Sequence, residues 1–216
     1  MPVQVKICGI NSAAAADAAL AAGADFGGLV FFPKSPRHLD LEAGRALAVR
    51  MRGQLRLAAL VVDESDDMLS AIAHAIQPDF FQLHGRETPA RAAEIRSRFG
   101  LPLIKAVSVA GPEDFANIAR YDGVADYLLF DAKPSADASR PGGHGAAFDW
   151  QLIQGRQFAQ PWFLAGGLTP ENVARAIAVS GAEMVDVSSG VESAPGVKSP
   201  DRIADFIAAA KQQVRA

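Results

Sequence analysis

The single cysteine of this chain, Cys8, closes a short run of alternating polar and apolar residues, Val3–Cys8. Alternation of this kind is typical of a strand with two different faces, and it places Lys6 and Cys8 on the same face. A thiol at the carboxyl end of a barrel strand can act as a base or a nucleophile. Free cysteine is also a common buried hydrophobic residue, and a reactive thiol needs an electropositive setting, so Cys8 alone leaves both interpretations open.

Polar residues recur near the ends of three other strand-like segments. In each segment they share one face, and apolar residues take the opposite face. The polar positions are Gln82, His84, Asp131, Asp186 and Ser188, whereas the opposite faces carry Leu83, Phe130, Val185 and Val187, as Ile7 does in the first segment. Inward-facing charge is costly without partners, so polar residues on the inward faces of four strands indicate a functional site.

Two short segments rich in glycine and serine, in the last third of the chain, predict a phosphate site. Gly166-Gly167 follows one strand-like segment and Ser188-Ser189-Gly190 follows the next. Backbone N–H groups in such loops and at helix N-termini bind anions, and a Cβ at Gly167 or Gly190 is expected to crowd the ion. The alternative for Gly166-Gly167 is that it only makes a tight turn.

Arg37 lies in the loop 33–39, beside Lys34, after the second strand-like segment. A guanidinium group at this position could hold a carboxylate through two parallel hydrogen bonds. The alternative is an ordinary solvated arginine on the surface.

The histidines do not form a metal-binding pattern. His38, His74, His84 and His144 are scattered, with no HExxH spacing and no close carboxylate partner in the sequence. A GxSxG nucleophile motif is also absent from the sequence. We interpret His84 either as a residue that lines the site or as an inner residue with its own hydrogen-bond partners.

Eight strand-like segments alternate with helical patterns along the whole chain. The predicted strands are 3–8, 25–32, 55–62, 79–84, 102–107, 126–131, 161–165 and 184–188, and the predicted helices are 11–22, 40–52, 65–77, 88–99, 111–121, 148–154, 169–180 and 199–214. Expected helix N-caps are Thr88, Thr169 and Ser199, each followed by proline, and expected helix stops are Gly100, Gly123 and Gly181. We therefore predict a single α/β domain over residues 1–216, a (β/α)₈ TIM barrel with its site at the carboxyl ends of the strands. An open doubly wound sheet is the alternative, although no GxGxxG motif follows the first strand.

The one long irregular segment, 132–147, is predicted to be a mobile flap, because it is rich in proline and glycine. These residues are Pro134, Pro141, Gly142, Gly143 and Gly145.

Composition excludes several classes of protein. The net charge of −3 gives no general attraction to nucleic acid or to anionic lipid. No apolar run reaches the ~18 residues of a membrane span. The single cysteine excludes an internal disulfide framework and no signal peptide is visible, so we expect a cytoplasmic protein. The sequence is compatible with a homo-oligomer, but the oligomeric state cannot be derived from it.

Seven motifs, spread from one end of the chain to the other, together resemble the phosphoribosylanthranilate isomerase family of tryptophan biosynthesis. They are KICGI at 6–10, FFPKSPR at 31–37, QLHG at 82–85, LLFDAK at 128–133, GGHGAAFDW at 142–150, GGLTPENV at 166–173 and VDVSSGVESAPGVK at 185–198. The resemblance implies a (β/α)₈ barrel and an Amadori rearrangement of N-(5-phosphoribosyl)anthranilate to the carboxyphenylamino-deoxyribulose phosphate. It also implies a phosphorylated small molecule as the ligand and no pyridoxal, metal or nicotinamide cofactor.

The resemblance further implies a role for each matching residue. Asp131 would be the acid that opens the furanose ring, and Cys8 the base that takes the C2′ proton, with Lys6 favouring its thiolate. Arg37 would hold the anthranilate carboxylate, and Asp186 would face the sugar or the anthranilate nitrogen. The phosphate would lie among Gly166, Gly167, Ser189 and Gly190, and His84 is included among the candidate substrate-binding residues.

Three other functions are weighed against this one. Another barrel isomerase acting on an aminoaldose phosphate is expected to use two aspartates, whereas the first strand here ends in Cys8. A metal-dependent pentose-phosphate epimerase lacks its ligand set in this sequence. A non-catalytic phosphate-binding barrel gives no reason for an acid and a thiol at the ends of different strands.

Overall fold

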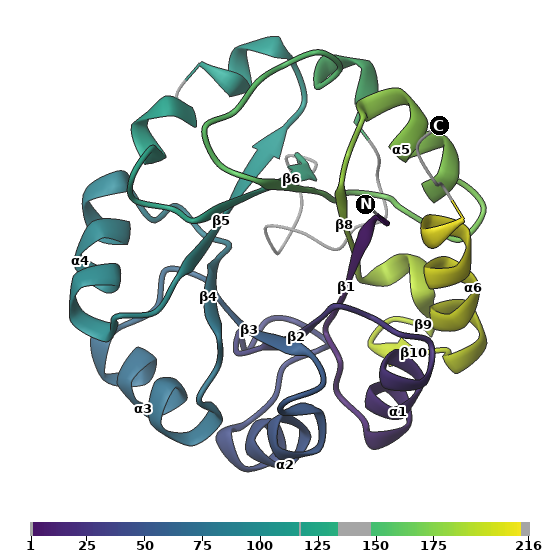
Figure 1. Ribbon diagram of the computed structural model, residues 1–216. Helices are drawn as coiled ribbons and strands as arrows, with labels where there is room; N and C mark the ends of the chain where they lie inside the picture. The colour runs from purple at the N-terminus through teal and green to yellow at the C-terminus, as the bar shows by residue number, and fades with distance from the viewer. Residues whose placement is uncertain (1, 117, 134–147, 213–216) are drawn as a thin grey trace.

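In the computed structural model, which describes residues 2–116, 118–133 and 148–212, eight parallel strands close into a barrel with helices around it (Figure 1). The strands pair in chain order, and β8 returns to β1. Their bounds are β1 Gln4–Cys8, β2 Phe26–Val30, β3 Arg56–Val61, β4 Phe80–Leu83, β5 Leu103–Val109, β6 Tyr127–Ala132, β7 Trp162–Leu164 and β8 Met184–Val187. The closed order confirms the predicted barrel and excludes the open doubly wound sheet.

Six of the predicted helices are α-helices in the structure. They are α1 Ala13–Ala21, α2 Leu41–Met51, α3 Asp66–Ile76, α4 Pro89–Phe99, α5 Val173–Ser180 and α6 Pro200–Lys211. The predicted caps Thr88 and Ser199 accept hydrogen bonds from the first turns of α4 and α6. Gly100 and Gly181 end α4 and α5 in the left-handed region that favours glycine.

The other two predicted helices, 111–121 and 148–154, are wrong in type. The structure forms short 3₁₀ turns there, η1 Pro112–Phe115, η2 Ile118–Tyr121 and η3 Trp150–Leu152. The Asp114 carboxylate accepts hydrogen bonds from the N–H groups of Ala110 and Gly111, at 2.7 and 3.1 Å, and this local bonding favours a short turn. After η3, Gly155 has a φ of +73° and ends the helical pattern.

The predicted cap Thr169 is also wrong, because α5 begins at Val173. The Asn172 side chain accepts from the Thr169 N–H at 2.8 Å and donates to the Gly167 carbonyl at 2.9 Å. These two bonds hold residues 167–172 as an irregular turn. The turn fixes the loop after β7 before the helix starts.

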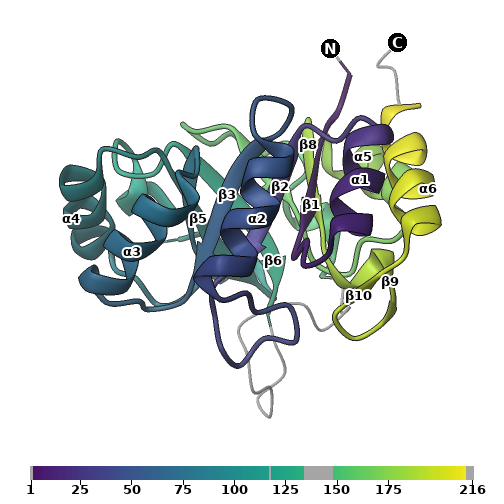
Figure 2. The same ribbon diagram turned by 90° about the horizontal axis from the view of Figure 1, so that it is seen from below.

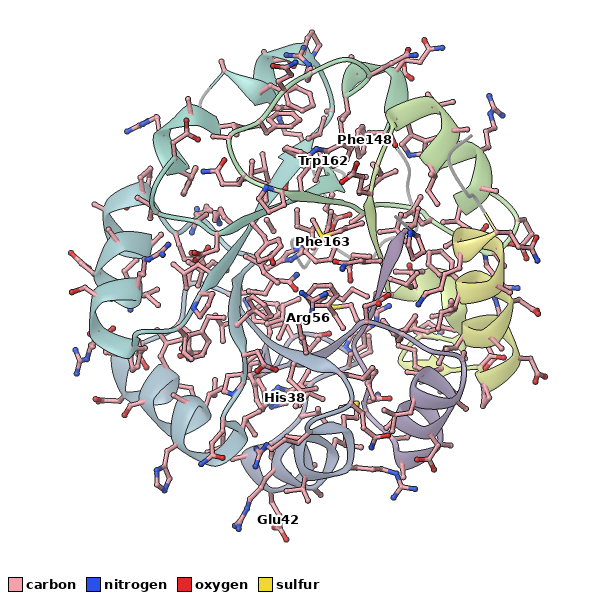
Figure 3. The ribbon with its side chains drawn as sticks, in the orientation of Figure 1. His38, Glu42, Arg56, Phe148, Trp162 and Phe163 are labelled. Carbon is pink, nitrogen blue, oxygen red and sulfur yellow. The ribbon has the colours of Figure 1, made fainter. Side chains whose placement is uncertain are left out.

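Strand alternation sorts the side chains as predicted. The outward residues Ile7, Leu83, Phe130, Val185 and Val187 are buried in the core between barrel and helices. The inner floor of the barrel is aromatic: the rings of Phe26 and Phe163 lie 5.1 Å apart, and those of Phe80 and Tyr127 5.5 Å apart. Figure 3 places Phe163 and Arg56 within the ring of strands. The polar site residues lie above this floor.

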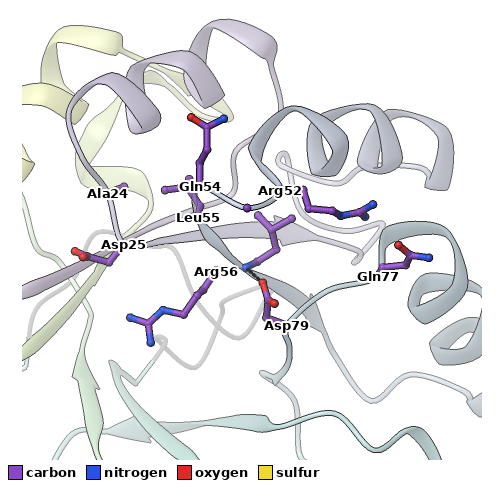
Figure 4. A pocket seen from close by; sticks show the side chains of 10 residues that line it. Ala24, Asp25, Arg52, Gln54, Leu55, Arg56, Gln77 and Asp79 are labelled. Carbon is purple, nitrogen blue, oxygen red and sulfur yellow. Dashed lines mark hydrogen bonds between the residues drawn. The ribbon is translucent and has the colours of Figure 1, made fainter.

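Near the amino ends of the strands, several aspartate carboxylates hold the backbone of a neighbouring strand. Three aspartates, each just before a strand, accept a hydrogen bond from the backbone of the preceding strand: Asp25 from Val5, Asp79 from Leu57 and Asp126 from Leu103. Asp25 and Asp79 line an open hollow of about 520 Å³ with Arg52 and Arg56 (Figure 4). These hydrogen bonds join adjacent strands and serve the stability of the barrel, since barrel enzymes place their chemistry at the other end.

A β-hairpin that the sequence did not predict follows β8. It consists of η4 Ser189–Val191, β9 Glu192–Ala194 and β10 Val197–Lys198, and the two strands are antiparallel. The hairpin lies on the same edge of the barrel as the loop after β2 (Figure 2). Its turn residue Gly196 has a φ of +80°, and a Cβ there would lie 2.5 Å from the Pro36 carbonyl oxygen. Glycine therefore permits the hairpin to pack against that loop.

Residues 134–147, most of the predicted flap, lie outside the described residues. Across the parts of the chain that the structure describes, no helix is long and apolar enough to cross a membrane.

Candidate active site

Lys6 and Asp186 form a buried ion pair inside the barrel. They stand at the same level on the adjacent strands β1 and β8, and Lys6 Nζ lies 2.9 Å from Asp186 Oδ1. Burial opposes the charge on Lys6, but Asp186 and, to a lesser degree, Cys8 outweigh it and raise the Lys6 pKa. The ammonium group is therefore held in place beneath the carboxyl end of β1.

Cys8 lies one inward position above Lys6, in a small apolar layer with Val30 and Leu60. Lys6 Nζ and Cys8 Sγ both adjoin Gly28 of β2, where a Cβ would be 3.0 Å from the first and 3.1 Å from the second. Burial raises the Cys8 pKa, while Lys6 acts in the opposite direction as the sequence predicted. Burial is the larger effect, so the thiol pKa is raised overall.

Asp131, near the end of β6, is paired with His84, the residue that follows β4. His84 Nε2 lies 3.3 Å from Asp131 Oδ2, and His84 Nδ1 lies 3.1 Å from Gln82 Nε2. The other carboxylate oxygen of Asp131 accepts from the Ala132 N–H at 2.9 Å. The structure thus brings together three of the polar residues that strand alternation placed on inward faces.

A second buried ion pair fixes the loop that follows His84. Lys105 of β5 donates to Glu87 Oε2 at 2.7 Å and to the Gly85 carbonyl at 2.8 Å. Glu87 in turn accepts from the Gly85 N–H at 3.0 Å and the Asp63 N–H at 2.9 Å. This pair was not predicted from the sequence, and its hydrogen bonds hold the segment that follows β4.

The loops after β7 and β8 meet at the same end of the barrel. Gly166 and Gly167 have φ values of +78° and +64°, and a Cβ on Gly166 would lie 2.5 Å from the Ala132 nitrogen. A Cβ on Gly190 would overlap the carbonyl oxygen of Leu168. Contact between the two loops therefore excludes a side chain at position 190 independently of any anion, whereas the expected crowding of an anion there stays a prediction.

Arg37 is buried, which excludes the solvated surface arginine. Its Nε and Nη2 donate to Glu192 Oε1 and Oε2 at 2.6 and 2.8 Å, and Lys198 Nζ donates to Oε1 at 2.8 Å. Burial alone would raise the Glu192 pKa, but Arg37 and Lys198 together lower it to about 2. Glu192 is therefore ionised across the ordinary pH range.

Sequence reasoning missed Glu192 and Lys198 as individual residues. Both lie within the motif at 185–198, but the motif alone does not assign a role to either of them. The Pro195-Gly196 dipeptide between them is a turn signal, and opposite charges flank it. That pattern could have predicted a hairpin, although not its contact with Arg37.

Metal ligation finds no support among the described side chains. No group of three or more His, Cys, Asp and Glu residues within them could hold a metal ion.

Fold and site together define a class of protein: a (β/α)₈-barrel enzyme with a carboxylate and a thiol near the carboxyl ends of different strands, and glycine loops after β7 and β8. The family model described as N-(5'-phosphoribosyl)anthranilate (PRA) isomerase matches residues 5–209. The chain belongs to this family, and it is an isomerase of tryptophan biosynthesis.

Similar proteins extend over almost the whole chain. The N-(5'-phosphoribosyl)anthranilate isomerase of Paracoccus denitrificans is 55% identical over 97% of this chain and 98% of its own, and that of Cereibacter sphaeroides is 53% identical over 97% and 99%. The crystal structure of the Thermotoga maritima phosphoribosylanthranilate isomerase covers 97% of this chain and 99% of its own, with a TM-score of 0.87 and 36% identity. A further isomerase of this name was solved with reduced 1-(o-carboxyphenylamino)-1-deoxyribulose 5-phosphate, with a TM-score of 0.83, 35% identity and the same coverage.

Proposed function

We propose that the isomerase reaction of this chain is the Amadori rearrangement of N-(5-phosphoribosyl)anthranilate by acid–base catalysis at Asp131 and Cys8. The supporting observation is that both residues lie near carboxyl ends of strands, on inward faces, in a barrel of the isomerase family. The two groups stand on β1 and β6, which are not neighbours in the barrel. A sugar bound across the mouth would therefore have one group on each side.

The first step opens the furanose ring. Protonated Asp131 gives its proton to the ring oxygen while the C1′–O bond breaks, and the lone pair of the anthranilate nitrogen forms the C=N bond of a Schiff base. His84, through its contact with Asp131 Oδ2, holds the carboxyl group in one orientation. Its other ring nitrogen contacts Gln82, which fixes the plane of the imidazole.

The second step takes the proton from C2′. The Cys8 thiolate accepts it, the electrons of the C–H bond form the C1′=C2′ bond, and the π electrons of the C=N bond return to the anthranilate nitrogen. The resulting enolamine then tautomerises to the ketone. Burial makes the thiolate scarce, because it raises the Cys8 pKa, but it also makes the thiolate a stronger base. Lys6, whose charge Asp186 supports, is the group that stabilises the thiolate.

The remaining residues bind the substrate. The phosphate is held by backbone N–H groups of the loops that contain Gly166, Gly167, Ser189 and Gly190. Glu192 uses only the Nε and Nη2 side of the Arg37 guanidinium. Among the described residues none accepts a hydrogen bond from Nη1, so this edge of the five-donor guanidinium remains for the anthranilate carboxylate. Asp186 is proposed to face the sugar or the anthranilate nitrogen while it holds Lys6.

A turnover assay tests this function directly. Purified protein should convert N-(5-phosphoribosyl)anthranilate to 1-(2-carboxyphenylamino)-1-deoxyribulose 5-phosphate. Chromatography measures the loss of the first compound and the appearance of the second. An aminoaldose phosphate without the anthranilate ring is the comparison substrate. Turnover of that compound alone would identify a different isomerase, and turnover of neither would support a non-catalytic barrel.

We propose the cytoplasm as the location, because a chain with one cysteine has no internal disulfide of the kind that oxidising compartments favour. The chemistry proposed needs no cofactor, because the Schiff base forms between two parts of the substrate itself.

A further inference from the structure

Arg37, Glu192 and Lys198 form a buried charged cluster, and the proposed reaction assigns no role to Glu192 or Lys198. The side chains of all three residues are 5% exposed or less, although each carries a charge. Placing three charged groups out of water is costly unless each is paired and hydrogen-bonded. Such a cluster is therefore expected to serve a specific purpose.

The hydrogen bonds of the cluster restrict Arg37 to one plane. The Glu192 carboxylate binds the guanidinium through two parallel bonds, at 2.6 and 2.8 Å, which fix both its position and its tilt. Glu192 is itself held by Lys198 at 2.8 Å and by the Gly196 N–H at 3.1 Å. The carboxylate therefore has little freedom to move with Arg37.

Lys198 connects this cluster to the end of β1. Besides Glu192, its ammonium group donates to the carbonyl and hydroxyl oxygens of Ser188, at 3.0 and 3.2 Å. The Ser188 hydroxyl then donates to the Cys8 carbonyl at 3.1 Å. The three donors of the ammonium group are thus matched by three acceptors.

The β9–β10 hairpin provides the frame that keeps Glu192 and Lys198 in position. At the turn of the hairpin, Gly196 packs against Pro36, the residue before Arg37. The Gly196 carbonyl oxygen accepts a hydrogen bond from Asn11 Nδ2 at 2.8 Å. The stem of Arg37 lies across Gly9, where a Cβ would be 2.5 Å from Arg37 Cδ. Loops from β1, β2 and β8 therefore meet around one guanidinium.

From this geometry we propose that Glu192 is a positioning residue, which sets the plane of the Arg37 guanidinium for the substrate carboxylate. Lys198 adds a second positive charge, so that the two cations and the one carboxylate of the cluster have a net charge of +1. Arg37 therefore still attracts an anion. This inference rests on the proposed role of Arg37. It predicts that Glu192 acts on substrate binding, and only through Arg37.

The test is steady-state kinetics with N-(5-phosphoribosyl)anthranilate on the Glu192→Gln, Arg37→Ala and double variants. Glutamine keeps the size of the side chain but replaces the carboxylate that makes the fork. Loss of one charge-assisted hydrogen bond corresponds to about tenfold in affinity, so KM for Glu192→Gln should rise by about tenfold while kcat stays within a few-fold. In the double variant, KM should equal that of Arg37→Ala.

Charge alone predicts the opposite direction. Removing a negative charge next to Arg37 would strengthen anion binding, so an unchanged or lower KM in folded Glu192→Gln would overturn the proposal. Additive effects of the two substitutions on KM would also overturn it. If Arg37→Ala itself leaves KM unchanged, the proposed role of Arg37 fails, and this inference fails with it.

Two further variants separate positioning from general loosening of the fold. Asp126→Asn removes the ion pair with Arg96 at the amino end of the barrel, and it should lower stability without raising KM. If Glu192→Gln does not fold, Glu192→Asp keeps the charge but is one methylene shorter, so it cannot reach the same fork. KM of Glu192→Asp should still rise, and an unchanged value would contradict the proposal.

Discussion

The two largest influences on the Cys8 pKa, burial and the charge of Lys6, act in opposite directions. Burial raises its pKa, and the charge of Lys6 lowers it. The sequence predicted the direction of the Lys6 effect, because alternation placed both residues on one face. It could not predict that burial is the larger effect, since burial depends on Val30 and Leu60 from other strands.

Replacing Lys6 with methionine should therefore raise the Cys8 pKa further. The main favourable charge disappears, and Asp186 is left to oppose the thiolate without its partner. Because Cys8 is the only cysteine of the chain, the rate of alkylation by iodoacetamide against pH reports this group alone. The midpoint should move to higher pH than in the unmodified chain, and a midpoint that moves down would contradict the assignment of Lys6.

Arg37 shows why some partners cannot be predicted from sequence. Its type and loop position indicated either a solvated arginine or a carboxylate-binding one. The partner observed, Glu192, is 155 positions away along the chain, and it reaches Arg37 only because an unpredicted hairpin folds back over the loop after β2. Local patterns contain no information on such a contact.

At the scale of elements, strands and α-helices were predictable where periodicity and caps agreed. Thr88 and Ser199 cap α4 and α6 as expected. The failures occur where side chains bond their own backbone: Asp114 holds 3₁₀ turns, and Asn172 delays the start of α5. Such local bonds compete with the helix, and the alternation of apolar residues does not reveal them.

The contact between the loops after β7 and β8 leads to a prediction about glycine. Gly190→Ala places a methyl group against the Leu168 carbonyl, so one loop must shift, and crowding of this kind typically costs ~1–3 kcal/mol. Ser189→Ala, the matched neighbour, should change stability by no more than about 0.5 kcal/mol. Urea unfolding of both variants measures the difference, and equal effects would show that the close approach is not rigid.

At the scale of the whole molecule, the closed barrel followed from one regularity repeated along the chain. Strands with polar inward ends alternate with helices, and the structure places those polar residues at one end. Apart from Arg37, which lies in the loop after β2, the site residues that the sequence found are on strands or in the segments that follow them. The residues that it missed, Glu192, Lys198, Glu87 and Lys105, support loops.

Acid should weaken the fold partly through Glu192. Its pKa is about 2 in the folded chain and 4.5 ordinarily, so its contribution is fully present above pH 4.5 and is lost as the pH falls towards 2. Glu192→Gln should lower the free energy of unfolding near neutral pH and make it less dependent on pH between those values. Urea unfolding over this pH range is the measurement, and an unaltered slope would contradict the lowered pKa.

Turnover should be unaffected by exhaustive treatment with a chelator, because neither step of the proposed reaction uses a metal. The control is protein dialysed without chelator and assayed at the same concentration of N-(5-phosphoribosyl)anthranilate. Activity that is lost with the chelator and restored by a divalent cation would require a different mechanism.

The central claim is that Cys8 and Asp131 carry out the proton transfers, and kcat of two variants tests it most directly. Cys8→Ala should lower turnover of N-(5-phosphoribosyl)anthranilate by ~10²–10⁴-fold while circular dichroism shows an intact fold. Asp131→Asn should lower it at least as far, because an amide cannot donate the proton that opens the ring. A kcat within a few-fold of the unmodified chain, in either well-folded variant, would contradict the assignment of that residue.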